Sequence, residues 1–213
     1  MAYSDIYLAA GEGVKLLLKQ RIRSFYALAL IDMRRIYTNG ILIETFQEFS
    51  SFSGTPLRIQ AEGCSVVRKG SAVILYDASV RSKRRRNWTI AHECGHILLK
   101  HTKSGAGEET EADAFAASFL LPEAAIRAMD HALGRPLTPH ELYGSFPASL
   151  SACRTRRAEL NARPYFPTAY DAQLLKLLFP CGPEALLPVF ESDRNRIPAR
   201  QPAWSLHLSQ HLI

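Results

Sequence analysis

The chain has 213 residues, of which 47% are hydrophobic and 22% are charged. This length supports one sizeable domain with or without an appendage, and the composition excludes disordered, collagen-like and coiled-coil chains. The net charge is +6, and five positive charges lie in the run 81–86 (RSKRRR), which we interpret as a solvated loop. Neither a secretory signal nor a membrane-spanning apolar run is evident, and the four scattered cysteines fit reduced thiols. We therefore expect a cytoplasmic protein without membrane partners.

The first third of the chain predicts helices followed by a small sheet. Apolar residues at helical spacing predict one or two helices over 12–36, and Asn39-Gly40 predicts a turn. Residues 50–56 are predicted to form a polar loop. Three short strands are predicted over 58–62, 64–68 and 72–76. Because the breaks between these strands are short, we expect antiparallel neighbours.

The remaining chain predicts mainly helices. The expected ranges are 87–100 with Asn87 or Thr89 as cap, 108–121, 122–129, 138–146 and 150–160 with Ser149 as cap. The fold class is therefore α+β, with N-terminal helices, a small antiparallel sheet and a helical C-terminal part. Pro164 and Pro167 mark a predicted boundary. We expect a domain over 1–165 and an appendage of unknown role over 168–213.

The most specific feature is the HExxH motif His92-Glu93-Cys94-Gly95-His96. On a helix, residues four apart share a face, so both imidazoles can bind one metal ion. Glu93 flanks them and can reach a water molecule on that metal as general base without being a ligand. Zinc is the expected metal, with manganese or iron as alternatives. A catalytic zinc needs a third protein ligand from elsewhere.

The next predicted helix offers this third ligand. Its apolar stripe comprises Ala112, Phe115, Ala116, Phe119 and Leu120. Glu109 extends the stripe backwards by one turn and is the preferred ligand, while Glu111 on another face stays open as the alternative. Asp113, on the same face as Glu109, is expected to accept a hydrogen bond from the free ring nitrogen of a ligand histidine.

Two blocks around these residues resemble the ImmA/IrrE family of metallo-endopeptidases. They are 88–96 (WTIAHECGH) and 109–122 (ETEADAFAASFLLP), with weaker support from 145–149 (SFPAS). The resemblance implies a gluzincin-like, zincin-type site with His92, His96 and Glu109 as ligands and Glu93 as general base. It also implies an intracellular protein of bacterial or phage origin. Its substrate would be a helix-turn-helix transcriptional repressor, here encoded separately, that controls a mobile element or a stress response.

Two other functions stay open beside zinc-dependent proteolysis. A metal-containing DNA-binding regulator is suggested by the basic run and by the helix pair 138–146 and 149–160, with Arg154, Arg156 and Arg157 on the second helix. Nucleic acid is nevertheless not the favoured partner, because such helix pairs are commonly plain hairpins. A protein-interaction module with latent activity is the third hypothesis, since a motif does not fix a substrate.

Substrate handling leaves a further set of candidates. The strand Ala72–Tyr76 is the candidate edge for pairing with a peptide substrate. Residues that could stabilise the oxyanion are Tyr76, His101, His140 and Tyr143. Cys94 is interpreted as a packed small residue, and the pair His207 and His211 as tail surface.

Overall fold

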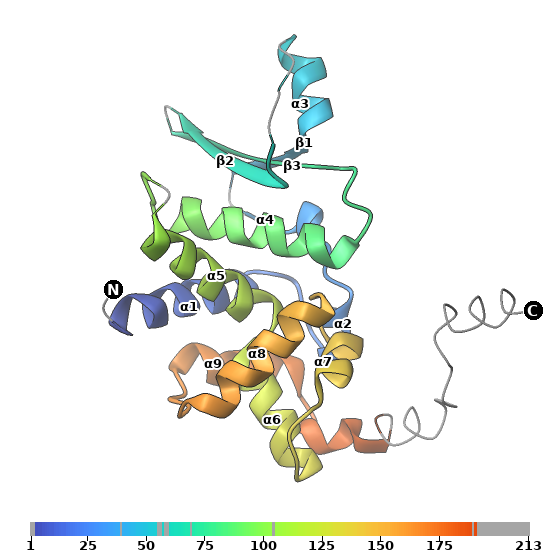
Figure 1. Cartoon of the computed structure of the whole chain (residues 1–213). Helices are drawn as coiled ribbons and strands as arrows, with labels where there is room; N and C mark the ends of the chain where they lie inside the picture. The colour runs from blue at the N-terminus through green and yellow to red at the C-terminus, as the bar shows by residue number, and fades with distance from the viewer. Residues whose placement is uncertain are drawn as a thin grey trace, which may run out of the picture.

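The computed structural model describes residues 3–38, 40–54, 57, 60–68, 70–103, 105–188 and 190. Over these residues the chain is α+β, as predicted (Figure 1). The α-helices are α1 (Tyr3–Leu18), α2 (Phe25–Ala29), α3 (Phe46–Ser53), α4 (Lys83–Leu98), α5 (Ala106–Leu120), α6 (Glu123–Leu133), α7 (Pro139–Ser145), α8 (Leu150–Ala162) and α9 (Ala169–Leu178). The strands are β1 (Ile41–Thr45), β2 (Gly63–Arg68) and β3 (Ser71–Tyr76), and short 3-10 helices cover Met33–Arg35 and Pro183–Leu186.

Helix α4 lies between the sheet and α5, and α1 packs against α5 (Figure 1). The predicted apolar stripe of α5 is confirmed, because all five of its side chains are fully buried. The largest of them, Phe115 and Phe119, belong to one hydrophobic core that also contains Ile90 of α4 and Ile74 of β3. Burying each such side chain contributes roughly 1.5–3 kcal/mol. The core therefore fixes α4 and α5 against each other.

The sheet is mixed, and the expectation of purely antiparallel neighbours is wrong. The strand order is β1-β3-β2, with β2 antiparallel to β3 and β1 parallel to β3. The short-turn argument holds for β2 and β3, which form a hairpin. It does not apply to β1, because α3 and β2 separate it from β3 in the chain and allow a crossover connection.

Strand β1 and helix α3 were missed by the sequence prediction. The five-residue run of β1 is too short to show alternation, and α3 occupies most of the predicted polar loop. Thr45 and Glu48 form a capping box that starts α3. Of the predicted strand 58–62, residues 58 and 59 lie outside the described residues, and 60–62 form no strand. Asn39 of the predicted turn also lies outside them.

The basic run does not form the predicted loop. It forms the first turns of α4, capped by Ser82 rather than by Asn87 or Thr89. Positive side chains are unfavourable at a helix N-terminus. Here Arg84 donates to the carbonyl of Tyr143, and Arg85 pairs with Glu62. These contacts offset the unfavourable position.

Helices α5 to α8 follow the prediction closely, including the caps at Thr138 and Ser149. Beyond them, α9 packs against α1 and α6, and its Leu174 and Leu178 are part of the core. The division of the chain at 165–168 into a domain and an appendage stays a prediction. Residues 191–213, with His207 and His211, lie outside the described part of the chain.

Candidate metal centre

Both histidines of the HExxH motif project from one face of α4. Their Nε2 atoms lie 3.0 Å apart, and their side chains are largely buried. Glu93 lines the same cavity as His92 and His96. The helical spacing of the motif therefore brings two imidazole nitrogens and a carboxylate to one place.

The glycine of the motif allows α5 to approach α4 closely. A Cβ atom on Gly95 would lie 3.0 Å from the Cα of Ala112 and 3.2 Å from the Cβ of Phe115, tighter than ordinary packing allows. Because Ala112 lies three residues after Glu109, this contact sets where the Glu109 carboxylate meets the histidines. A residue larger than glycine would separate the two helices.

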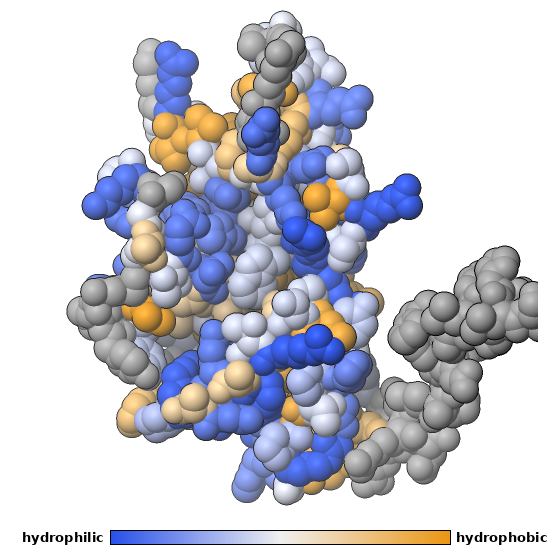
Figure 2. All heavy atoms as spheres, viewed as in Figure 1, coloured by the Kyte–Doolittle hydropathy of each residue, from blue (hydrophilic) through white to orange (hydrophobic). Residues whose placement is uncertain are grey.

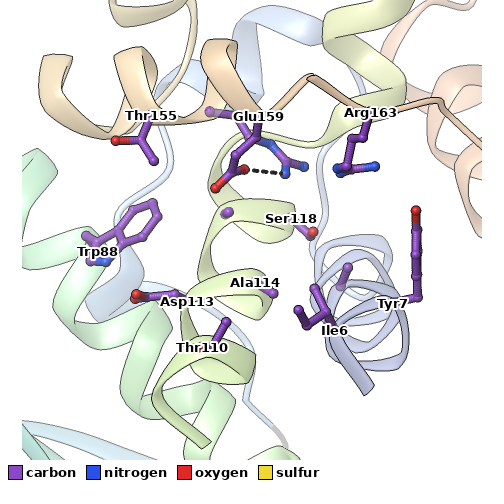
Figure 3. Close-up of a pocket in the computed structure, with 13 residues that line it drawn as sticks. Ile6, Tyr7, Trp88, Thr110, Asp113, Ala114, Ser118, Thr155, Glu159 and Arg163 are labelled. Carbon is purple, nitrogen blue, oxygen red and sulfur yellow. Dashed lines mark hydrogen bonds and ion pairs between the residues drawn. The ribbon is translucent and has the colours of Figure 1, made fainter. Parts of the chain in front are cut away.

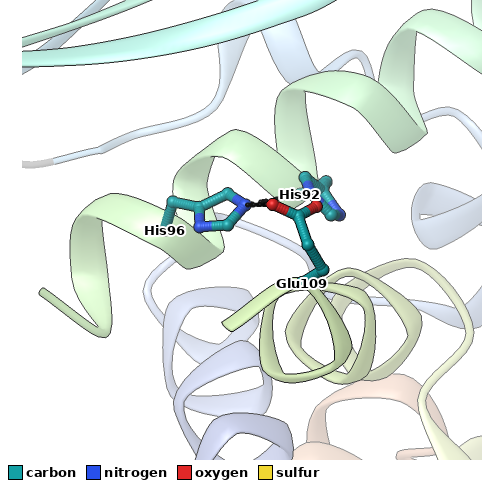
Figure 4. A group of neighbouring side chains, drawn as sticks. All are labelled: His92, His96 and Glu109. Atoms are coloured by element: carbon teal, nitrogen blue, oxygen red, sulfur yellow. Dashed lines mark hydrogen bonds and ion pairs between the residues drawn. The ribbon is translucent and has the colours of Figure 1, made fainter. Parts of the chain in front are cut away.

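Glu109 completes a cluster of three ligand atoms (Figure 4). Its Oε2 lies 3.1 Å from Nε2 of His92, and its Oε1 lies 3.6 Å from Nε2 of His96. Tetrahedral ligands at zinc–ligand distances of about 2.05 Å are about 3.3 Å from one another. The separations of 3.0, 3.1 and 3.6 Å, which involve both carboxylate oxygens of Glu109, lie close to this value, so the donor set fits a divalent metal.

Asp113 lies beside the outer nitrogen of His92. Its Oδ1 is 2.9 Å from Nδ1 of His92, so the imidazole donates to the carboxylate when Nε2 faces the cluster. Burial alone would lower the pKa of His92, but this hydrogen bond and the charges of Asp113, Glu93 and Glu109 raise it above its usual value. Burial and the neighbouring His92 lower the pKa of His96.

The raised pKa of His92 predicts a pH dependence for metal binding at this cluster. A metal binds only neutral imidazole, so affinity falls as pH drops through this pKa, at a higher pH than an ordinary histidine would give. Below it, we expect affinity to fall roughly tenfold per pH unit. Zinc titrations against a competing chelator between about pH 5 and 8 would measure this. Asp113→Asn is expected to move the onset to lower pH, and an unchanged onset would contradict the assignment.

Glu111, the alternative ligand, lies elsewhere. Its Oε2 is 3.1 Å from Nε2 of His101, whose Nδ1 is 2.9 Å from Nδ1 of His96. The structure thus brings Glu109 to the two motif histidines. Glu111 does not reach them and contacts His101, which lies between Glu111 and His96. From the sequence, His101 is a candidate for stabilising the oxyanion and Glu111 an alternative metal ligand, and their contact with each other is not predicted.

The chain leaves α4 through a left-handed residue that is not glycine. Lys100 has φ = 60°. Its N–H donates to the carbonyl of Ile97, and the N–H of His101 donates to the carbonyl of His96. This pair of hydrogen bonds is the Schellman motif, in which glycine is usual at the left-handed position.

Lys100→Gly is therefore expected to stabilise the protein. Glycine adopts φ = 60° without the Cβ strain that lysine bears there, so we expect an increase of roughly 0.5–1 kcal/mol in the free energy of unfolding. Denaturant unfolding would measure it. The matched variant Lys100→Val should lose stability, because a β-branched residue is strained at positive φ. Equal stability of the two variants would contradict the interpretation.

The cluster lies in a cavity of about 430 Å³ that has strand β2 as one wall. Gly63, Cys64 and Ser65 contribute that wall. A Cβ on Gly63 would clash with Thr89 of α4, so glycine is needed for this close approach. The site predicted from the sequence does not include these residues, although a glycine beside a strand is a signal of close backbone approach.

Of the four oxyanion candidates, only His101 lines this cavity. Both of its ring nitrogens already face hydrogen-bonding partners. Tyr76 is buried, and Tyr143 lies under the guanidinium of Arg84. Cys94 is fully buried, and burial together with the charge of Glu93 raises its thiol pKa to about 12. It is a packed side chain, as interpreted from the sequence.

A second cavity, of about 350 Å³, lies where α1, α5 and α8 meet (Figure 3). Asp113 and Trp88 line it, and an ion pair between Arg156 and Glu159 closes one side. Its lining includes neither motif histidine nor Glu93. Among the described residues, the groups needed for hydrolysis therefore meet in the first cavity.

An HExxH helix with a glutamate from the following helix defines a metallopeptidase type of site. The Peptidase_M78 family model, the IrrE N-terminal-like domain, matches residues 45–156, more than half of the chain. The chain belongs to this family and is a metallo-endopeptidase. A comparison with curated proteins found no match. No helix in the described part of the chain combines the length and the apolar character needed to cross a membrane.

Proposed function

We propose that the chain is a zinc-dependent endopeptidase with a zincin-like arrangement. His92, His96 and Glu109 hold the metal, Glu93 is the general base, and Asp113 orients His92. The observation that carries the proposal is the convergence of three ligand atoms within 4.8 Å of one another, in a cavity that also contains Glu93. The donor set of two imidazoles and one carboxylate is that of a catalytic zinc site with an open position.

Each residue has a defined task in peptide hydrolysis. A divalent metal bound here supplies Lewis-acid polarisation of a water molecule and of the substrate carbonyl. Glu93 accepts the proton that the attacking water loses and delivers it to the nitrogen of the leaving amine. Asp113 accepts a hydrogen bond from Nδ1 of His92, which keeps Nε2 directed at the ligand cluster.

Strand β2 is the better candidate for binding the peptide backbone. The predicted edge, Ala72–Tyr76, lies in β3, which is the central strand and is paired on both sides. Among the described residues β2 pairs only with β3, and it lines the cavity. An extended substrate can therefore add to β2 by backbone hydrogen bonds and pass over the metal ligands.

The exposed sheet surface is consistent with a protein substrate. Val66 and Val67 of β2 and Leu42 of β1 are about half exposed or more. Figure 2 shows hydrophobic surface gathered at the sheet end of the molecule. The resemblance stated above makes a separately encoded helix-turn-helix repressor the proposed substrate.

The alternative of a DNA-binding regulator, which rested on the basic run and on Arg154, Arg156 and Arg157, loses two of these arginines. Arg157 of α8 forms two hydrogen bonds to Asp130, and Arg156 pairs with Glu159 and donates to the carbonyl of Leu121. Both arginines are buried. They stabilise the contact between α8 and its neighbours, so they do not form a basic face for phosphates.

The proposal is tested by incubating the zinc-loaded chain with intact helix-turn-helix repressors from the same genome. Mass spectrometry would locate new chain ends, and a chelator-treated sample serves as the control. We expect cleavage at a discrete site in one or a few repressors, lost with chelator and regained with zinc. Cleavage that ignores the chelator, or that spares every repressor, would contradict the proposal.

A further inference from the structure

The outer nitrogen of His96 begins a chain of two further side chains. Its Nδ1 lies 2.9 Å from Nδ1 of His101, and Nε2 of His101 lies 3.1 Å from Oε2 of Glu111. We propose that His101 and Glu111 are positioning residues that hold the imidazole of His96 in its metal-binding orientation and tautomer. This inference rests on the proposed function in treating His96 as a ligand.

The direction of each hydrogen bond in this chain follows from the cluster. Nε2 of His96 faces Glu109 and His92, so a ligand His96 carries its proton on Nδ1 and donates it to His101. Nδ1 of His101 must then be an acceptor, and neutral His101 carries its proton on Nε2. That proton is donated to Glu111. A carboxylate at the end of the chain therefore determines the tautomer of both imidazoles.

The backbone at the end of α4 brings His101 to this position. In a Schellman motif, the residue two beyond the cap contacts the residue three before it, usually through apolar side chains. Leu99 is the cap of α4, so these two residues are His101 and His96. In this protein the contact between these two residues is a hydrogen bond between their imidazole rings. Lys100, held at φ = 60°, is the residue that makes this return of the chain possible.

The two ligand histidines are supported in different ways. The outer nitrogen of His92 contacts Asp113 directly, whereas among the described residues the outer nitrogen of His96 is linked to a carboxylate through His101. The side chain of Asp113 is 57% exposed, while those of His101 and Glu111 are 7% and 23% exposed. Hydrogen bonds sheltered from water are electrostatically stronger. The hydrogen-bond chain through His101 is therefore better protected from water than the Asp113 contact. We expect its removal to lower the affinity for zinc.

The test measures the zinc dissociation constant by competition with a chromophoric chelator, with the Co²⁺ absorption spectrum as a second readout. His101→Phe keeps a planar aromatic ring but leaves the Nδ1 proton of His96 without an acceptor, so we expect about a 10- to 100-fold loss of affinity. His101→Asn places an oxygen near the original Nδ1 position and should recover most of this loss. Zinc affinity unchanged in His101→Phe, or no recovery in His101→Asn, would overturn the proposal.

Double variants separate a serial chain from two independent contacts. Because Glu111 acts through His101, Glu111→Ala combined with His101→Phe should bind zinc no more weakly than His101→Phe alone. Asp113→Ala supports the other ligand and is the matched control, so its loss should multiply with that of His101→Phe. Multiplying losses for the Glu111 and His101 pair would overturn the proposal. Thermal unfolding of the metal-free variants checks that they fold. If His101→Phe does not fold, the zinc affinity of Glu111→Ala alone tests the hydrogen-bond chain.

Failure of this inference can be told from failure of the proposed function. A wild-type chain that binds zinc but cleaves no protein would contradict the endopeptidase proposal and leave the positioning role intact. An enzyme that cleaves protein but whose zinc affinity is unchanged by substitution of His101 would contradict the positioning role and leave the endopeptidase proposal intact. A wild-type chain that binds no zinc at all would overturn both.

Discussion

Glu93→Gln is expected to abolish detectable peptide cleavage while the zinc content stays at the wild-type value. Glutamine has nearly the shape of glutamate but cannot accept the proton that the attacking water loses. General acid–base catalysis contributes roughly 10²- to 10⁴-fold to such a reaction. Glu93 is not one of the three residues whose ligand atoms cluster, so the metal should be retained. Cleavage rates and metal analysis on the same preparation would test both statements.

Two controls make the Glu93 result specific. Glu108→Gln changes a carboxylate in the first turn of α5 that does not line the cavity, and it should cleave at the wild-type rate. Cleavage by Glu93→Gln within tenfold of the wild type would remove Glu93 from the mechanism. Loss of zinc from Glu93→Gln would instead assign this carboxylate to metal binding.

Glu109→Ala and Glu111→Ala are expected to differ strongly in metal content. Removing Glu109 deletes one of three ligand atoms and leaves two imidazoles, so zinc affinity should fall by more than roughly 100-fold, the upper range for residues that only support a ligand. Glu111→Ala should lose less, because its carboxylate contacts His101 rather than the cluster. Metal analysis after dialysis, with zinc titrations on both variants, would measure the difference.

The reverse outcome has a clear meaning. Loss of zinc in Glu111→Ala alone would exchange the roles of the two glutamates and invalidate the ligand set. Glu109→Asp serves as an intermediate variant, since it keeps the carboxylate but shortens its reach by one methylene group. We expect weaker zinc binding than in the wild type and stronger binding than in Glu109→Ala.

Local periodicity is enough to predict most of the helices. It also predicts that the candidate site residues of two consecutive helices face one another. The stripe from Ala112 to Leu120 predicted which face of α5 is buried, and Glu109 could be placed from it by one helical turn. The caps at Thr138 and Ser149 were readable because a capping side chain acts within three residues of itself. Helix periodicity and N-caps depend on residues a few positions apart, so the local sequence is enough to predict them.

The features that were missed depend on distant partners or on unusual backbone. The parallel pairing of β1 with β3 joins segments about 30 residues apart, and nothing in Ile41–Thr45 specifies its partner. The contact of His101 with His96 requires a left-handed residue at position 100, where lysine gives no sign of one. Gly63 and Gly95 were visible in the sequence, but the close approaches that need them appear only when the elements are packed.

The tight contact of α4 with α5 at Gly95 also bears on how the protein takes up its metal. Apolar burial at Phe115 and Ala112 joins the two helices, so we expect the candidate metal pocket to assemble without help from the ion. In zinc fingers, by contrast, the free energy of metal binding is consumed in folding the chain. We therefore expect the metal-free protein to keep its fold, so that removing and restoring the metal should switch hydrolysis off and on without a refolding step.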